Sequence, residues 1–182
     1  MVQDPVGCCV YVTLEPCSHR GRTGPCAQAL IDAGVARVVI ACEDPNPQVC
    51  GQGIQLLKDA GIEVDCGLLE DQARVLNQGF IKRHEHGLPW VLVKMAASMD
   101  GRTAMASGQS QWVTTPASRH DVQKLRAKSC AIITGIGTQL MDDPSLTVRI
   151  TSEQLGIDDV LQQPLRVVID SQLQMSATAR ML

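Results

Sequence analysis

Two cysteines near the start of the chain have the side chains and setting best suited to chemistry. Cys17 follows Pro16 at the end of an apolar run, and Cys26 follows Pro25 at the start of a helix-like stretch. Thiolates are favoured zinc ligands, and a helix N-terminus lowers the pKa of a cysteine toward the deprotonated form that binds metal. The polar segment 18–25 between them suits a loop that faces a substrate. The pair therefore predicts two ligands of a zinc site.

The spacing of the pair leaves other interpretations open. Zinc deaminases combine a His-x-Glu element with Pro-Cys-x-x-Cys, whereas residues 18–25 separate the two cysteines here, so the general signature matches only weakly. Thiols in a reducing compartment are also buried small hydrophobes or nucleophiles. We interpret Cys42, Cys66 and Cys130 as buried hydrophobes because they lie in apolar runs.

The elements that must position the pair alternate between strands and helices. Apolar runs of strand length predict strands at 10–14, 36–42 and 62–66. Helical patterns predict a helix that opens at Pro25, one over 53–60 and one over 70–82, and the prolines at 45 and 47 predict a loop. This alternation implies right-handed crossovers and a mostly parallel sheet.

A second unit follows the polar run 82–86. We place the boundary at Gly87, which gives domains of residues 1–86 and 87–182. Beyond it we expect buried strands at 130–135 and 165–170, a strand at 90–97, and a surface connection over 151–163. Thr115 followed by Pro116 predicts a helix running to about residue 128. The fold class is α/β, in two units.

Composition narrows the classes of partner. The net charge is −3 with 19% charged residues, which gives no reason to expect nucleic acid or a membrane as a partner. No apolar run reaches the roughly 18 residues of a membrane span, and the first residues do not resemble a signal peptide, so we expect a cytoplasmic protein. His84 and His86 would not share a helix face, so we interpret them as solvated surface instead of metal ligands.

Several longer stretches carry a resemblance to a known family. Residues 11–26 closely resemble the pyrimidine-deaminase half of the bifunctional riboflavin-biosynthesis deaminase/reductase family, whose zinc cysteines have this longer spacer. Residues 44–53, 98–104, 108–114 and 137–149 are similar to the same family, in the same order. The resemblance implies the C-terminal part of a cytidine-deaminase-like three-layer domain, followed by the N-terminal part of a dihydrofolate-reductase-like domain. It also implies zinc and NADPH as cofactors.

The same resemblance indicates what residues 1–182 do not contain. The family's third zinc ligand and its proton-shuttling glutamate lie in a His-Ala-Glu element upstream of the Pro-Cys strand. Residues 1–16 contain no histidine, and Glu15 is their one glutamate. The family's later cofactor segment lies beyond residue 182. We therefore expect a chain truncated at both ends and impaired in both activities, and we assign no catalytic residue.

The resemblance also implies binding residues in the second unit. Those expected to contact NADPH are Ala96, Trp112, Thr138, Asp142 and Ser171. Those expected to line the substrate are Ser110, Arg126, Leu146 and Arg149. Taken without the resemblance, an arginine on a helix is usually solvated, a tryptophan is more often core, and a lone Gly-x-Gly such as 135–137 is weak.

The family reaction gives the expected function. It deaminates a small phosphoribosylamino-pyrimidine and then reduces the ribosyl group to ribityl with NADPH. Family members are commonly dimers, so a homodimer is a possible state for this chain. The alternative is a non-catalytic nucleotide-binding or assembly remnant of the same scaffold, which the missing His-Ala-Glu element favours for the first unit.

Overall fold

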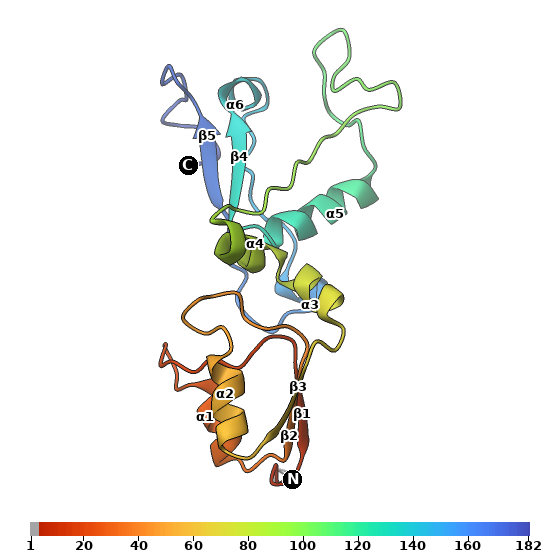
Figure 1. Ribbon diagram of the computed structural model, residues 1–182. Helices are drawn as coiled ribbons and strands as arrows, with labels where there is room; N and C mark the ends of the chain where they lie inside the picture. Colours follow the sequence, from red (N-terminus) through yellow and green to blue (C-terminus); the bar gives the residue numbers. More distant parts are fainter. Residues whose placement is uncertain (1–3) are drawn as a thin grey trace. The chain divides into compact units, whose positions relative to one another are not determined.

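A computed structural model describes residues 4–182 and divides the chain into two compact units, with the division between Val93 and Lys94 (Figure 1). Residues 1–3, which belong to the predicted first domain, lie outside the described residues.

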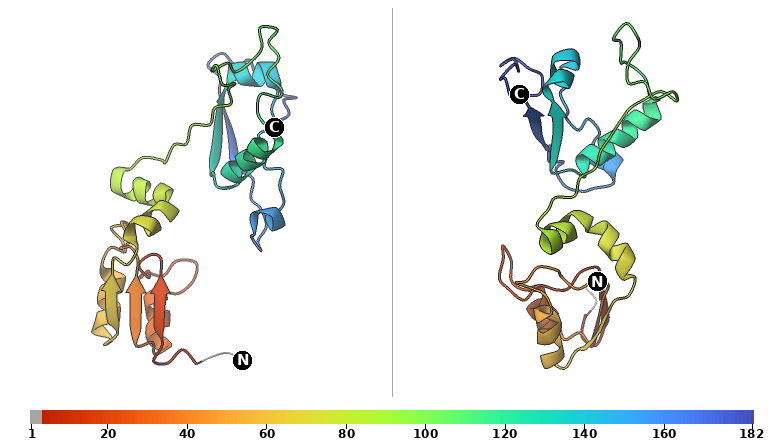
Figure 2. Two further views of the ribbon diagram at one scale, coloured as in Figure 1. Left: turned by 90° about the vertical axis from the view of Figure 1, so that its right-hand side faces the viewer. Right: turned by 45° about the horizontal axis from the view of Figure 1, so that its top comes forward.

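Unit 1 is built on a parallel sheet of three strands. These are β1 (Cys9–Val12), β2 (Arg37–Ile40) and β3 (Glu63–Cys66), hydrogen-bonded in the order β1-β2-β3. Helix α1 (Cys26–Asp32) connects β1 to β2, and α2 (Gln52–Asp59) connects β2 to β3 (Figure 2). The three predicted strands and the two crossover helices are therefore confirmed. Because the strands are parallel, their carboxyl ends meet at one edge of the sheet.

The core of unit 1 lies between the sheet and the two crossover helices. Val38 and Ile40 of β2 are fully buried, as are Ala27 of α1 and Leu57 of α2. Figure 1 shows α1 and α2 on the same side of the sheet. Val39 points to the other side of the sheet and is also buried, so β2 is covered on both faces. Burial of such aliphatic side chains contributes about 1.5–3 kcal/mol each.

The helix predicted over 70–82 is two helices. α3 (Glu70–Leu76) and α4 (Gln78–His86) are separated by Asn77, whose backbone leaves helical geometry at φ −111° and ψ 21°. The break lets the chain turn back, so that Arg74 of α3 pairs with Glu85 of α4 at 2.6 Å. The side chain of His86, in the last turn of α4, is 63% exposed, as its interpretation as surface requires.

Unit 2 contains two parallel strands and three helices. β4 (Ala131–Gly135) pairs with β5 (Leu165–Ile169), and the helices are α5 (Pro116–Ala127), α6 (Ile136–Asp142) and α7 (Ser152–Leu155). α5 starts where the sequence predicts: Oγ1 of Thr115 accepts the Ser118 N–H at 3.2 Å, and Pro116 occupies the first turn. α7 lies inside the segment predicted to be a surface connection.

Three sequence-based expectations are wrong. Residues 90–97 form no strand, and Val91, Val93 and Met95 are exposed, because no described strand lies beside them to complete a hydrogen-bonded ladder. Cys66, the last residue of β3, and Cys130, which precedes β4, are also exposed; Cys42 is buried as expected.

The strands of unit 2 are buried on one face only. Ile132 and Val168 pack against a cluster that contains Leu146, Ala179 and Met181. On the opposite face, Ile133 is 63% exposed, and Leu165 and Ile169 are exposed as well. The expectation that both strands are buried is therefore wrong for this face, because among residues 4–182 no element covers it.

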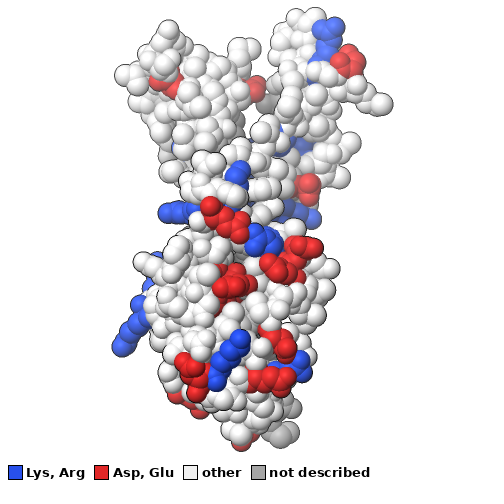
Figure 3. Space-filling model, viewed as in Figure 1, with Lys and Arg blue, Asp and Glu red and all other residues white. Residues whose placement is uncertain are grey.

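Charged side chains of both signs are interspersed over unit 1 on the face drawn in Figure 3, in keeping with the small net charge. None of the helices described between residues 4 and 182 is long and apolar enough to span a membrane.

Candidate metal and nucleotide sites

Cys17 is held against the N-terminus of α1. Its sulfur accepts the backbone N–H of Cys26 at 3.3 Å, and its carbonyl oxygen accepts the N–H of Ala27 at 3.1 Å. The first turn of a helix has backbone N–H groups without partners inside the helix, and Cys17 satisfies two of them. The structure therefore brings the two predicted zinc ligands together at the carboxyl edge of the sheet.

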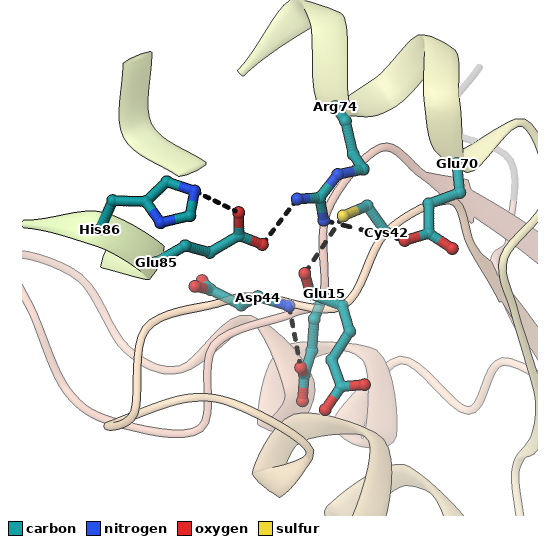
Figure 4. Close-up of polar contacts among 8 residues, drawn as sticks. Glu15, Cys42, Asp44, Glu70, Arg74, Glu85 and His86 are labelled. Carbon is teal, nitrogen blue, oxygen red and sulfur yellow. Dashed lines mark hydrogen bonds and ion pairs between the residues drawn. The ribbon is translucent and has the colours of Figure 1, made fainter. Parts of the chain in front are cut away.

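Glu15 is held in the same way against the N-terminus of α2. Its side chain is buried, and each carboxylate oxygen accepts two backbone N–H groups. Oε1 accepts from Gly53 at 2.9 Å and Ile54 at 3.1 Å. Oε2 accepts from Gly51 at 3.0 Å and from Asp44 at 3.2 Å, a contact drawn in Figure 4. Hydrogen bonds to a charged carboxylate are among the strongest in proteins, and the helix dipole adds to them.

Gly53 allows α2 to approach the segment that carries Cys17. A Cβ atom at this position would lie 1.9 Å from the carbonyl oxygen of Pro16 and 3.2 Å from Oε1 of Glu15. No real contact is that short, so this close approach requires glycine. Ser18 adds a further link to α2 through its hydroxyl, 3.3 Å from Oε1 of Gln52. Residues 15–18 therefore join the N-termini of both crossover helices.

The two thiols fit two positions of a zinc site. The hydrogen bond between the thiols raises the pKa of Cys26, with burial as the second cause. The direction is opposite to the one expected for a helix N-terminus, because the hydrogen bond to Cys17 and burial both raise the pKa of Cys26. Among residues 4–182, no group of three or more His, Cys, Asp or Glu is placed to hold a metal ion. Four-coordinate zinc needs further ligands beyond these two thiols.

Glu15 cannot replace the glutamate of the missing His-Ala-Glu element. A general base needs a free oxygen within hydrogen-bond reach of the water that it deprotonates. Both oxygens of Glu15 already accept backbone N–H groups. Glu15 is therefore held as a structural acceptor at the N-terminus of α2.

A cluster of charged side chains covers Cys42 near the same edge (Figure 4). Arg74 lies 2.6 Å from Glu85 and 3.8 Å from Glu70, and the Glu85 hydrogen bond is the main cause of the raised pKa of Arg74. Burial raises the pKa of the Cys42 thiol, whose sulfur donates to the carbonyl oxygen of Glu43 at 3.2 Å. The Arg74–Glu85 contact joins α3 to α4, and burial outweighs the opposing effect of Arg74 on the pKa of Cys42.

In unit 2, the carboxyl edge of the sheet gathers several of the residues predicted to bind NADPH. Thr138 lies in the first turn of α6, which follows β4 directly, and Ser171 follows β5 by one residue. Because β4 and β5 are parallel, the two positions lie at the same edge. Asp142, at the end of α6, accepts a hydrogen bond from the hydroxyl of Ser110 at 3.2 Å. Loop 105–114 is therefore tied to α6.

Trp112 lies exposed on this loop. Its ring is 67% exposed, and the guanidinium of Arg119 lies over it, 4.3 Å from the ring centroid. Arg119 also donates to the carbonyl oxygen of Thr114. Trp112 is therefore not a core residue. Ala96, the remaining predicted NADPH contact, lies in an extended stretch that ends at the turn closed by the bond from the N–H of Gly101 to the carbonyl oxygen of Ser98.

Arg126 and Arg149 form a pair of cations. Arg126 is half-buried on α5 and donates to the carbonyl oxygen of Thr147 at 3.0 Å. Burial lowers the pKa of Arg126, and the nearby charge of Arg149 lowers it further. Within residues 4–182 neither guanidinium forms an ion pair with a carboxylate. Two neighbouring cations without a counter-ion are typical of an anion site.

Leu146 is buried, unlike the other residues that are predicted to line the substrate. Its side chain packs with Ala179 and Met181 in the core of unit 2, and its backbone is left-handed, with φ of 51°. This conformation is strained for a leucine. It lets the chain turn between the buried side chain of Leu146 and the exposed Arg149.

Sequence reasoning missed three residues that shape the two sites. From the sequence, Glu15 is noted only as the one glutamate of residues 1–16, Gly53 only as part of a stretch similar to the family, and Arg119 not at all. A Gly-x-Gly pair at a helix start, at 51–53, could have indicated close backbone approach. Nothing in the sequence places Arg119 over Trp112.

The fold and the two sites define a class: an α/β protein of two units, with a cytidine-deaminase-type zinc region followed by a reductase-type domain. The family model "Cytidine and deoxycytidylate deaminase zinc-binding region" matches residues 2–42, and the model "RibD C-terminal domain" matches residues 89–182. The second match covers more than half of the chain. The chain belongs to the RibD family.

Similar proteins agree with this assignment. The chain is 54% identical to the riboflavin biosynthesis protein RibD of Escherichia coli and 52% identical to that of Haemophilus influenzae, covering 97% and 96% of this chain and 49% and 48% of the relatives. A solved structure of Acinetobacter baumannii RibD aligns with a TM-score of 0.89 at 51% identity, over 98% of this chain and 49% of that one. The chain thus spans about half the length of the relatives that it matches.

Proposed function

We propose that the chain acts in riboflavin biosynthesis, with residues 1–86 as part of a pyrimidine deaminase domain and residues 87–182 as part of a reductase domain. The family reaction deaminates a small phosphoribosylamino-pyrimidine and reduces its ribosyl group to ribityl. A solved Thermotoga maritima relative, 36% identical over 98% of this chain and 48% of its own length, with a TM-score of 0.87, is described as such a deaminase and 5-amino-6-(5-phosphoribosylamino)uracil reductase.

The pairing of Arg126 with Arg149 is the observation that carries this proposal. Arg126 of α5 donates to the carbonyl oxygen of Thr147, and the backbone N–H of Arg149 donates to Gln123 of α5, so the two arginines come from adjoining segments. The repulsion between their charges would be relieved by an anion bound between them. A ribose phosphate supplies such an anion, and the planar guanidinium matches phosphate oxygens with two parallel N–H donors. Ser110 and Leu146 complete the proposed substrate-binding set.

The proposed NADPH contacts are Ala96, Trp112, Thr138, Asp142 and Ser171. NADPH, when bound, supplies the hydride that reduces the ribosyl group. The role of the protein is to hold both molecules in register and to neutralise their phosphates, since positioning and electrostatics carry such a step. Ser110, through its hydrogen bond to Asp142, would keep loop 105–114 in place while the cofactor binds.

For unit 1, we propose that Cys17 and Cys26 provide two thiolate ligands to zinc. We assign no deamination step to residues 4–182 alone, because they bring no third ligand and no free base to the pair. This observation favours the alternative for unit 1, a scaffold without chemistry of its own. A cytoplasmic location and a homodimer remain predictions.

Titration with NADPH tests the proposal. In a Trp90→Phe background Trp112 is the single tryptophan, since the chain has two. We expect saturable quenching of Trp112 fluorescence, because the nicotinamide nucleotide would lie along the exposed ring. The matched variant Trp112→Phe, which retains Trp90, controls for absorption of light by NADPH and should show no saturable change.

The outcomes separate the two functions. Saturable quenching with slow turnover of a phosphoribosylamino-pyrimidine supports the enzyme, and quenching without turnover supports the nucleotide-binding remnant. A folded chain whose Trp112 shows no saturable response would contradict both.

A further inference from the structure

Three features lie outside the proposed chemistry: the cavity beside Tyr11, the exposed face of β4 and β5, and the clamp at Glu15, meaning its four hydrogen bonds to backbone N–H groups. The cavity has a volume of about 240 Å³ and apolar walls, among them Val39 and Leu69. Nothing in the structure shows what covers either the cavity or the exposed face. The clamp is different, because its contacts are complete and lie beside the thiol pair.

We propose that Glu15 is the positioning residue of the Cys17–Cys26 pair, fixing the separation of the two sulfurs by tying residues 15–17 to the N-terminus of α2. This inference deepens the proposed role of the two cysteines as paired ligands, and it rests on that role for its biological meaning. Glu15 touches no substrate and no metal.

Residues 15–17 are attached to both crossover helices. Cys17 is attached to α1 through the N–H groups of Cys26 and Ala27. Glu15 is attached to α2 through the N–H groups of Gly53 and Ile54. One intervening residue, Pro16, separates the anchors, and its ring fixes one of its two backbone angles. A movement of Glu15 is therefore transmitted to the Cys17 sulfur with little loss.

Glu15 also holds loop 44–51 through its second carboxylate oxygen. Oε2 accepts the N–H groups of Asp44 and Gly51, which lie at the two ends of loop 44–51. Within that loop, Asp44 Oδ1 accepts the N–H of Asn46 at 2.8 Å. One carboxylate thus accepts hydrogen bonds from a loop and from a helix N-terminus. Both are connected to Cys17 through Glu15.

The carboxylate of Glu15 is fully occupied by these hydrogen bonds. Its four acceptor positions are filled by four backbone donors, and the side chain is 4% exposed. A carboxylate kept only for solubility would face water. Removing a buried charged acceptor leaves several N–H groups without partners, which costs much more than the bonds contribute on average.

The test uses a reagent that requires two neighbouring thiols. Phenylarsine oxide binds two thiols through arsenic and releases one water molecule, so it reports how the sulfurs are placed without any need for zinc. Trypsin cleaves after Arg20 and Arg22, which places Cys17 and Cys26 on different peptides. An arsenic bridge between them therefore appears as a linked peptide pair in mass spectrometry, whereas a Cys8–Cys9 bridge stays within one peptide.

The decisive variant is Glu15→Gln, and its matched control is Glu43→Gln. Glutamine keeps the shape of Glu15 but presents an NH₂ group to donors that need an acceptor. Glu43 lies in the same region and is exposed, and its carboxylate accepts only from the Cys50 thiol. We expect bridging in Glu15→Gln to need about 10–100-fold more reagent, the range found when residues that orient ligands are altered. Glu43→Gln should bridge like the unaltered chain, and Cys17→Ser should give no linked peptide pair.

Amide exchange separates positioning from simple unfolding. In a folded Glu15→Gln variant, the amides of Val38 and Ile40 in β2 should stay protected while those of Gly53 and Ile54 exchange faster. If Glu15→Gln does not fold, Glu15→Asp keeps the charge but shortens the reach by one methylene, and it should show a weaker form of the same defect. A folded variant that bridges like the unaltered chain overturns the inference.

Zinc content, measured separately on the unaltered chain, keeps this inference distinct from the proposed function. Arsenic bridging without bound zinc would remove the zinc proposal and leave the role of Glu15 intact. Bound zinc together with unchanged bridging in a folded Glu15→Gln variant would support the zinc proposal and contradict the positioning role of Glu15.

Discussion

Replacing Gly53 by alanine is expected to destabilise unit 1 by about 3 kcal/mol, the upper end of the range for overpacked interiors. The added Cβ would lie 1.9 Å from the carbonyl oxygen of Pro16, so α2 must move away from residues 15–17. That movement also stretches the hydrogen bonds from Gly53 and Ile54 to Glu15. The sign is notable, because glycine to alanine within a helix usually stabilises by about 0.5–1 kcal/mol.

Gly24→Ala is the matched control for this prediction. Gly24 also lies in unit 1, and a Cβ there would meet nothing within 4 Å. Its backbone is not left-handed, so alanine is compatible with it, and the free energy of unfolding should stay the same or rise by a few tenths of a kcal/mol. Urea unfolding of both variants gives the comparison. Equal stability of the two would show that α2 does not depend on this close approach.

Arg126→Met is expected to raise the stability of the chain while it weakens binding of phosphate esters. The pKa of Arg126 is lowered, first by burial and then by Arg149, so the charged form is less favourable in the folded state than in the unfolded chain. Arginine is charged at every accessible pH, so this cost is present throughout. Methionine has no charge, so the replacement removes this cost of half-burying the guanidinium. The lost hydrogen bond to Thr147 offsets about 1 kcal/mol of that gain.

Binding should change in the opposite direction. A hydrogen bond from a charged donor contributes about 1.5–3 kcal/mol, which corresponds to roughly a 10–150-fold loss of affinity for ribose 5-phosphate. Lys124→Met is the control, because this cation also lies on α5 and is exposed. Calorimetric unfolding and ligand titration of both variants are the two measurements. Unchanged affinity in Arg126→Met would exclude the arginine pair as the phosphate site.

Local sequence signals predicted the elements that depend on few partners. The apolar run around Val38 and Ile40 predicted a strand, and Thr115 with Pro116 predicted the start of α5. The stretch at 90–97 has the composition of a strand but forms none, because a strand requires a neighbour that pattern alone does not supply. The break at Asn77 was missed because the helical pattern continues through it, and the turn is held by the distant pair Arg74 and Glu85.

The residues of the candidate sites also divide into those with local sequence signals and those that depend on distant contacts. Cys17 and Cys26 were found because their residue type and their place beside a strand end and a helix start are local properties. The residues that hold them are visible only in three dimensions: Glu15 acts through Gly53, which is 38 residues away. In unit 2, the family resemblance named Arg126 and Arg149, whereas their lack of counter-ions emerged only from the structure.

The exposed apolar face of β4 and β5 affects how this chain can be handled in the laboratory. Ile133, Leu165 and Ile169 form a water-facing surface on the native protein. Environment-sensitive dyes bind such surfaces in folded proteins as well as in loosened ones. The chain should therefore give bright dye emission before any heating, so that dye-based melting curves start high and lose their transition. Calorimetry and circular dichroism, which need no dye, will report its unfolding faithfully.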